Sequence, residues 1–196
     1  MTDLRNLANS SRDLASLAEK IAPAANAAPQ TSSPPQLQTI QTLAAQFCQN
    51  ASVAAAQTGT ITFFTGPDDA AKVVAAQSLA GSLHRELNRI DLSALVSQHA
   101  GDTINVLTQL LHSSAATGAI LLFDEADALF DKRTSVQDSL DRYADASADE
   151  LGRSSAFLQL LEQYPGLIIL AVHSTDGWNP SLLQHAHATL KFPPTP

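Results

Sequence analysis

Short apolar runs alternate with longer amphipathic segments along the chain from residue 60 onward. The runs typical of buried strands are Ile61–Phe64, Leu87–Leu92, Ile120–Phe123, Leu167–Val172 and Thr189–Phe192. Helical periodicity falls between them, near residues 70–83, 103–113, 148–163 and 180–186. Strands that alternate with helices of this length require crossover connections. The pattern therefore predicts an α/β domain with a five-stranded, mostly parallel sheet flanked by helices.

The N-terminal part of the chain has a different pattern. Leucine and isoleucine recur at helical spacing in residues 3–21, which predicts an N-terminal helical arm over residues 1–21. Residues 22–36 hold four prolines among Ala, Ser and Thr, so we interpret them as a linker. An Ala-rich helix is expected over residues 37–57, ahead of an α/β domain at residues 58–196. We expect the arm either to fold back on the domain or to dock a partner.

Composition narrows the class of protein. The 196 residues suit one domain of roughly 100–200 residues with a small additional arm. With 11 Lys and Arg against 19 Asp and Glu, the net charge is −8, which argues against nucleic acid or an anionic membrane as a partner. The single cysteine, Cys48, excludes a disulfide framework and a cysteine-based zinc site. Apolar runs far shorter than ~20 residues and a start without a secretory signal lead us to expect a cytoplasmic protein.

A candidate phosphate-binding loop follows the first apolar run. Gly66 and Lys72 match the first glycine and the lysine of the pattern G-x-x-x-x-G-K-[ST], in which backbone N–H groups surround phosphates. Ala71 and Val73 replace the second glycine and the hydroxyl residue of that pattern. Taken alone, these residues fit an ordinary strand-to-helix turn with a solvated lysine equally well.

An acidic run, Asp124-Glu125-Ala126-Asp127, follows the apolar residues 119–123. A strand that ends there puts the first two carboxylates at the carboxyl edge of the sheet, where ligands bind in such folds. Asp124 would hold Mg²⁺ through water, and Glu125 would polarise an attacking water. The alternative is that both residues cap the next helix. Together with Gly66 and Lys72, the run favours a nucleotide site.

Five stretches in this order resemble the large subdomain of AAA-clade AAA+ ATPases, over roughly residues 58–193. They are Phe64–Pro67, Ile90–Ser97 with Gly101–Thr103, Gly118–Arg133, Asp138–Ala144 and Gly166–Ala171. The resemblance implies a P-loop NTPase-like fold. The nucleotide-binding positions that it implies are Gly66, Pro67, Lys72 and Asp124. It also implies that Asp124 holds Mg²⁺ through water, that Glu125 is the catalytic base and that His173 stands at the sensor position. The run at residues 132–144 is most similar to bacterial AAA ATPases, including those that accompany phage-tail-like contractile injection systems.

Most positions that the family needs for hydrolysis are altered. Asp69 replaces a loop glycine and Asp68 lies beside it. A carboxylate about 4 Å from a phosphate charge costs about 4 kcal/mol at an effective dielectric near 20. The alternative is that both carboxylates point to solvent and cap the next helix, which also implies an empty loop. Val73 has no hydroxyl to offer Mg²⁺. The remaining departures are His173 in place of the sensor asparagine, Gln184, His185 and His187 at the arginine-finger positions, His99-Ala100 in the substrate-gripping loop, and an expected absence of the helical lid.

These departures favour a degenerate AAA+-like interaction, assembly or regulatory module without ATP hydrolysis, and no cofactor is expected. The expected partner is an intact AAA+ ATPase or a larger bacterial assembly, with no nucleic acid and no membrane. Two alternatives stay open. One is a divergent ATPase that uses ATP or ADP with Mg²⁺, with Glu125 as base and the missing elements supplied in trans. The other is a nucleotide sensor without turnover.

Two further expectations concern the charged residues and the assembly. We hypothesise that Lys72 forms an internal ion pair with Asp124 or Glu125, which holds the strand ends together. For such a scaffold, the substitution Lys72→Ala should change stability only modestly. The sequence does not predict whether the chain forms a homo-oligomer.

Overall fold

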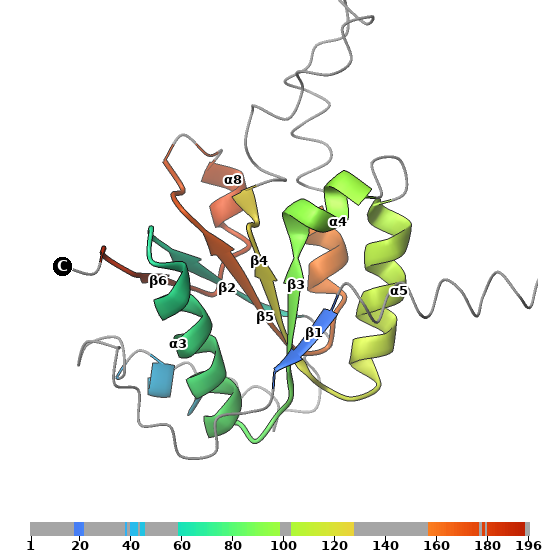
Figure 1. Cartoon of the computed structure of the whole chain (residues 1–196), viewed down its shortest axis with the longest axis horizontal. Coiled ribbons are helices and arrows are strands. Elements are labelled where there is room, and N and C mark those ends of the chain that lie inside the picture. The colour runs from blue at the N-terminus through green and yellow to red at the C-terminus, as the bar shows by residue number, and fades with distance from the viewer. Residues whose placement is uncertain are drawn as a thin grey trace, which may run out of the picture.

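The strands form one six-stranded sheet with the order β1-β3-β4-β5-β2-β6 (Figure 1). This computed structural model describes residues 18–21, 38, 40–42, 44–45, 59–98, 103–127, 157–176, 178 and 180–194. The strands are β1 (Ala18–Ile21), β2 (Thr60–Thr65), β3 (Leu87–Asp91), β4 (Ile120–Asp124), β5 (Leu167–Val172) and β6 (Ala188–Lys191). Neighbouring strands are parallel throughout, except that β1 runs antiparallel to β3. The five predicted strands and their mostly parallel arrangement are confirmed.

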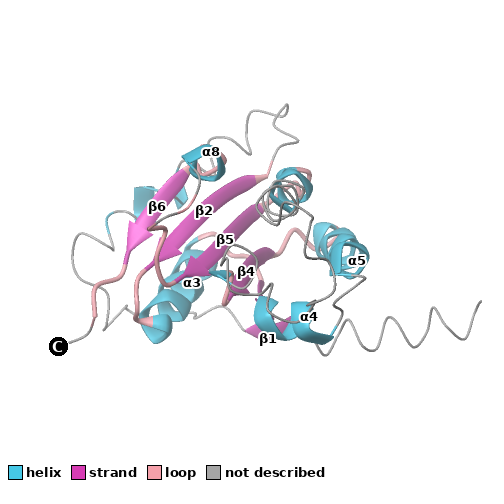
Figure 2. Cartoon of the chain, turned by 90° about the horizontal axis from the view of Figure 1, so that it is seen from above, coloured by secondary structure: helices cyan, strands magenta, loops and turns pink. Residues whose placement is uncertain are grey.

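Helices cover both faces of the sheet, as Figure 2 shows from above. Helix α3 (Asp69–Ser82) lies on one face, and α4 (Leu92–Gln98) and α5 (Thr103–Ala115) lie on the other. Residues 157–162 are also helical, and α8 (Pro180–Leu183) precedes β6. The helices expected near residues 70–83 and 103–113 are therefore present, and the one expected near 180–186 is limited to α8. Of the helix expected near 148–163, residues 157–162 are helical, and residues 148–156 lie outside the described residues. Helix α4 was not predicted, although the Asp91 side chain accepts a hydrogen bond from the Ala94 N–H at 2.8 Å and so supports its first turn.

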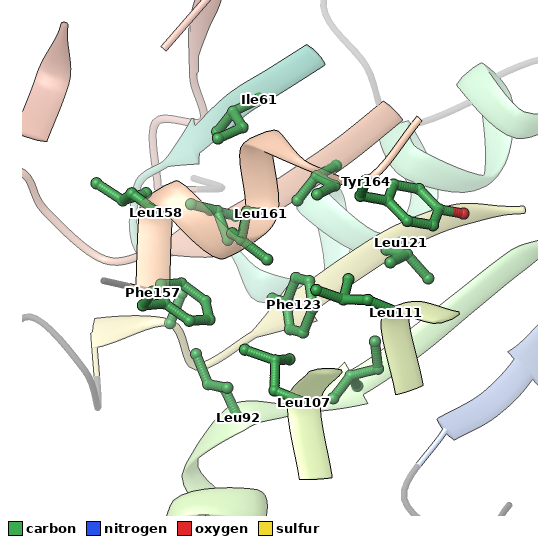
Figure 3. Close-up of a cluster of buried hydrophobic side chains, with 14 of the residues drawn as sticks. Ile61, Leu92, Leu107, Leu111, Leu121, Phe123, Phe157, Leu158, Leu161 and Tyr164 are labelled. Carbon is green, nitrogen blue, oxygen red and sulfur yellow. The ribbon is translucent and has the colours of Figure 1, made fainter. Parts of the chain in front are cut away.

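Two apolar clusters hold the helices against the sheet. Strands β4 and β5 are buried along their whole length, because helices cover both of their faces. The cluster on the α5 side is the larger one and includes aromatic side chains (Figure 3). On the other face, α3 packs through the small side chains Ala75, Ala76 and Ala80, which let the helix approach the sheet closely.

The N-terminal prediction is wrong for the residues that the structure describes there. Residues 18–21 were expected to end a helix, but they form strand β1 and give the sheet a sixth, antiparallel strand. The edge of β3 offers unpaired N–H and C=O groups, and pairing with them outweighs a weak helical pattern. Ile21 packs against the α3-side cluster, and Glu19 lies 3.7 Å from the Arg89 guanidinium. Residues 1–17 lie outside the described residues.

Part of the Ala-rich helix predicted over residues 37–57 is described. Residues 38, 40–42 and 44–45 are helical, and Ile40 and Ala44 are buried in the α3-side cluster. The predicted linker at 22–36, the loop containing His99-Ala100 and the run at 132–144 lie outside the described residues. In the part of the chain that is described, no helix has the length and hydropathy needed to cross a membrane.

Candidate functional site

The loop between β2 and α3 is short and tightly held. Gly66 has a φ of +137°, and a Cβ at this position would come within 1.9 Å of the Phe192 carbonyl oxygen. The Gly66 N–H donates to the Val172 carbonyl at 3.1 Å, and the Phe192 N–H donates to the Thr65 carbonyl at 2.7 Å. Only glycine fits this backbone and this close approach to β6. The loop therefore lies against the ends of both β5 and β6.

Helix α3 begins earlier than the phosphate-loop pattern implies. In that pattern the residues between the first glycine and the lysine form a loop whose N–H groups face phosphates. Here α3 starts at Asp69, three residues before Lys72. Asp68 caps the helix by accepting the Ala71 N–H at 2.9 Å, and its carbonyl accepts the Lys72 N–H at 3.2 Å. The expected capping of the helix is confirmed for Asp68, whereas Asp69 forms an ion pair with Lys72. The N–H groups of Ala71 and Lys72 therefore bond within the chain.

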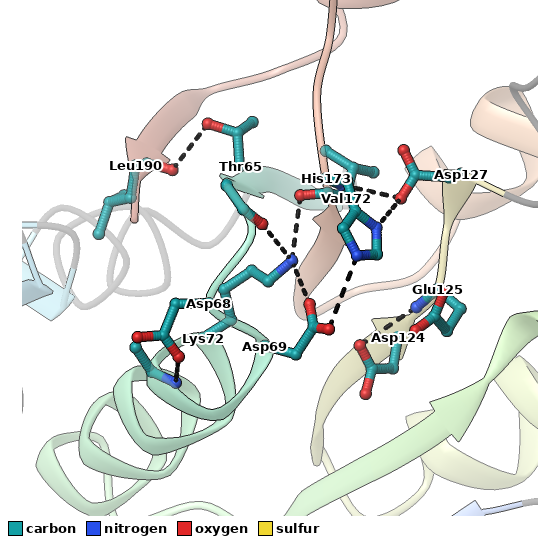
Figure 4. A network of polar contacts seen from close by, with 12 residues as sticks. Thr65, Asp68, Asp69, Lys72, Asp124, Glu125, Asp127, Val172, His173 and Leu190 are labelled. Atoms are coloured by element: carbon teal, nitrogen blue, oxygen red, sulfur yellow. Dashed lines mark hydrogen bonds and ion pairs between the residues drawn. The ribbon is translucent and has the colours of Figure 1, made fainter. Parts of the chain in front are cut away.

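Lys72 is bound by its own surroundings (Figure 4). Its side chain is 1% exposed, and Nζ lies 2.7 Å from Asp69 Oδ1. Nζ also donates to the carbonyl oxygens of Gly66 at 2.8 Å and Val172 at 3.1 Å. An ammonium group has three N–H donors, so all of them have partners. The hypothesised pairing of Lys72 with Asp124 or Glu125 is wrong, because Asp69 is nearer in the chain and lies one helical turn away.

Asp124 is held by an arginine from the neighbouring strand. Its Oδ2 accepts from Arg89 Nε at 3.0 Å and from Arg89 Nη2, and its Oδ1 accepts the Glu125 N–H at 3.1 Å. The Asp124 side chain is 6% exposed and that of Arg89 39% exposed. The hydrogen bond to Asp124 raises the pKa of Arg89 further above its ordinary value, against the opposing effect of burial. The pair neutralises both charges.

Glu125 and His173 lie at the same edge of the sheet and are exposed. Glu125 has a φ of +54°, which is uncommon for a residue with a side chain. Asp127 Oδ2 accepts the His173 N–H at 2.8 Å and lies 3.1 Å from His173 Nδ1. His173 Nε2 lies 3.7 Å from Asp69 Oδ2. The structure thus brings Gly66, Lys72 and His173 together through Asp69, while Asp124 pairs separately with Arg89.

The histidines at the arginine-finger positions have contacts within the fold. His185 Nδ1 lies 2.6 Å from Glu162 Oε1. His187 Nδ1 accepts the Ile61 N–H at 3.2 Å, and the His187 N–H donates to the Ile61 carbonyl at 2.8 Å. Both histidines therefore join the β6 connection to the rest of the domain. Gln184 is exposed.

Comparison with known proteins agrees with this architecture. The model of the family described as ATPase family associated with various cellular activities (AAA) matches residues 62–193, more than half of the chain. The chain belongs to the AAA family. The crystal structure of the FIGL-1 AAA domain is similar to it with a TM-score of 0.68 and 12% sequence identity. The likeness covers 94% of this chain and 60% of that one, and at this identity it shows the fold alone. A comparison with curated proteins finds no match.

Two residues of this AAA domain carry roles that the sequence did not reveal. Arg89 is a charged residue at the centre of β3, and a charge within a predicted strand was the available signal that it has a partner in the fold. Asp69 precedes Lys72 by three residues, a spacing at which helical side chains meet. Among the described residues, no group of three or more His, Cys, Asp or Glu side chains could hold a metal ion.

Proposed function

We propose that this AAA domain does not hydrolyse ATP and acts as an interaction, assembly or regulatory module. The observation that carries the proposal is the Lys72 ammonium, which is 1% exposed and has three acceptors from its own chain. A phosphate could contact this ammonium only by displacing one of them. The Asp69 carboxylate is tethered beside Nζ, and a tethered group competes at an effective concentration on the order of millimolar or more.

The arrangement around Asp124 also supports the proposal. A magnesium site needs several oxygen ligands in near-octahedral geometry. One Asp124 oxygen faces the Arg89 guanidinium and the other accepts a backbone N–H, so a cation would have to displace a charged partner. Val73 brings a hydrocarbon side chain to the position where the family has a hydroxyl. These side chains do not fit a bound Mg²⁺.

For the partner, we propose an intact AAA+ ATPase or a larger bacterial assembly in the cytoplasm. The support is the likeness of residues 132–144 to bacterial AAA ATPases, including those of contractile injection systems, and a net charge of −8 that disfavours nucleic acid and anionic membranes. Binding to such an ATPase should persist in Lys72→Met if nucleotide plays no part. Co-purification of the two proteins after co-expression measures this, and loss of the complex in Lys72→Met while the variant stays folded would contradict it.

Calorimetric titration of the full chain with ATP and ADP, each with and without Mg²⁺, tests the absence of nucleotide binding. We expect no heat of binding up to millimolar nucleotide. Micromolar binding that requires Mg²⁺ would overturn the proposal, because the Lys72 and Asp124 partners would then be easily displaced.

A divergent ATPase is the second candidate, and the exposed Glu125 carboxylate beside Asp124 favours it. A general base needs access to a water molecule, which an exposed carboxylate at a strand end has. This candidate requires ATP turnover by the unmodified chain, supplied with its missing elements by a partner. The substitution Glu125→Gln should then abolish turnover and leave ATP binding intact.

A further inference from the structure

One carboxylate at the carboxyl edge of the sheet contacts groups from two directions. Asp69 Oδ1 lies 2.7 Å from Lys72 Nζ, and Asp69 Oδ2 lies 3.7 Å from Nε2 of His173, which follows β5 (Figure 4). The side chains of Asp69 and His173 are 43% and 50% exposed, whereas that of Lys72 is 1% exposed. Solvent therefore reaches this contact from the side of Asp69 and His173.

The buried ammonium needs an anion at this position. A charge taken out of water is costly unless it has a charged partner and hydrogen bonds. The carbonyls of Gly66 and Val172 supply hydrogen bonds but no net charge. Within the part of the chain that the structure describes, Asp69 is the one carboxylate in an ion pair with Lys72. Removing the Asp69 carboxylate would leave the ammonium without a counter-ion and open its surroundings to solvent.

We propose that Asp69 is an internal ligand of an oxyanion site formed by Lys72 Nζ and His173 Nε2, and that it keeps this site closed to phosphate and phosphoryl groups. The inference rests on the proposed function and supplies a physical cause for it. A carboxylate that directs one oxygen to an ammonium and the other to an imidazole makes the contacts that two oxygens of a phosphate would make. The Asp69 carboxyl group fills the space between Lys72 Nζ and His173 Nε2 that a phosphate would need.

The neighbouring Asp68 provides a matched control. Its carboxylate caps α3 through the Ala71 N–H, whereas the partners of the Lys72 ammonium are Asp69 and the carbonyls of Gly66 and Val172. Asp68→Asn removes the same unit of charge one residue earlier and keeps an oxygen that can cap the helix. A general effect of lost negative charge would appear in both variants. An effect of opening the site would appear only at Asp69.

The test is a calorimetric titration of inorganic phosphate into the full chain, in a buffer without other phosphate or sulfate. Asp69→Ala should bind phosphate roughly ten- to a hundredfold more tightly than the unmodified chain or Asp68→Asn, the range of one charge-assisted hydrogen bond. The double variant Asp69→Ala/Lys72→Met should lose this gain. Equal binding by Asp69→Ala and Asp68→Asn would overturn the inference.

A second measurement covers an Asp69→Ala variant that folds poorly. The melting temperature of Asp69→Ser should rise with phosphate by more than it rises with chloride at equal ionic strength, and the absence of a phosphate-specific rise would also overturn the inference. A titration of the unmodified chain with ATP and Mg²⁺ separates the two proposals. Micromolar ATP binding there would overturn the proposed function. If the unmodified chain binds no ATP and Asp69→Ala binds no phosphate, only the role of Asp69 is overturned.

Discussion

Replacing Lys72 is expected to destabilise the domain well beyond the modest change that the sequence led us to expect. Lys72→Met keeps most of the side-chain volume and removes the ammonium group. The carbonyl oxygens of Gly66 and Val172 would then lose a donor in a place where water does not reach the Lys72 side chain. These two acceptors connect the β2–α3 loop to the end of β5, so the loop would lose part of its attachment to the sheet.

The magnitude follows from the partners of Nζ. The Val172 carbonyl keeps the Gly66 N–H as a donor at 3.1 Å, so the part-buried Gly66 carbonyl is the acceptor that Lys72→Met leaves without its donor. Such a loss costs about 1–3 kcal/mol. The ion pair with Asp69 adds less than about 1 kcal/mol, since that side chain is 43% exposed and solvent screens it. Release of the ammonium from burial offsets part of this loss, so we expect Lys72→Met to lower the free energy of unfolding by about 1–3 kcal/mol. Lys72→Ala also loses three buried methylenes and should cost about 2 kcal/mol more.

Urea unfolding followed by tryptophan fluorescence measures these changes. Trp178 is the single tryptophan, and its ring lies edge-on to Phe63 with centroids 5.6 Å apart, so its emission reports the packing of the α5-side cluster. Lys20→Met is the matched control, because that side chain is 72% exposed and its replacement should change the free energy by less than about 0.5 kcal/mol. If Lys72→Met unfolds at the same urea concentration as Lys20→Met, Lys72 does not hold these carbonyls, and the structural basis of the proposed function fails.

Three other substitutions test the remaining polar and backbone features. Arg89→Leu should lower the free energy of unfolding by about 3 kcal/mol, because Asp124 stays buried without its counter-ion. Adding Asp124→Asn should restore part of this loss, and no recovery in urea unfolding would contradict the prediction. Gly66→Ala should lower the free energy of unfolding by more than about 2 kcal/mol, since the new Cβ would overlap the Phe192 carbonyl oxygen. An unchanged midpoint of urea unfolding would contradict this. Burial raises the pKa of Tyr164 to about 12, so the folded state favours the neutral phenol. The stabilisation of the folded state by this neutral phenol is present below pH about 10 and is lost as the pH rises to about 12. Over that interval the unmodified chain should lose about 2–3 kcal/mol more than Tyr164→Phe, and parallel pH profiles would contradict this.

Much of the architecture follows from local sequence signals. The strands at the centre of the sheet, β4 and β5, are buried on both faces and therefore appear in the sequence as continuous apolar runs. The alternation of such runs with helical segments implies parallel strands joined by crossovers. Asp68 was placed correctly as a helix cap because capping depends on residues within one turn. The family was also evident from short motifs in a fixed order, and the match over residues 62–193 agrees with it.

Tertiary structure decided the features that depend on pairing between distant segments. Residues 18–21 have helical spacing, yet they become a strand because the open edge of β3 offers hydrogen bonds that the local sequence does not encode. Arg89 meets Asp124 only because β3 and β4 are adjacent and in a register that places both side chains on one face. Lys72 Nζ donates to the carbonyl of Gly66, in the loop just before it, and to that of Val172, which lies 100 residues after Lys72 in the sequence. A sequence names the charged residues, but only the arrangement of the strands determines which charges neutralise one another.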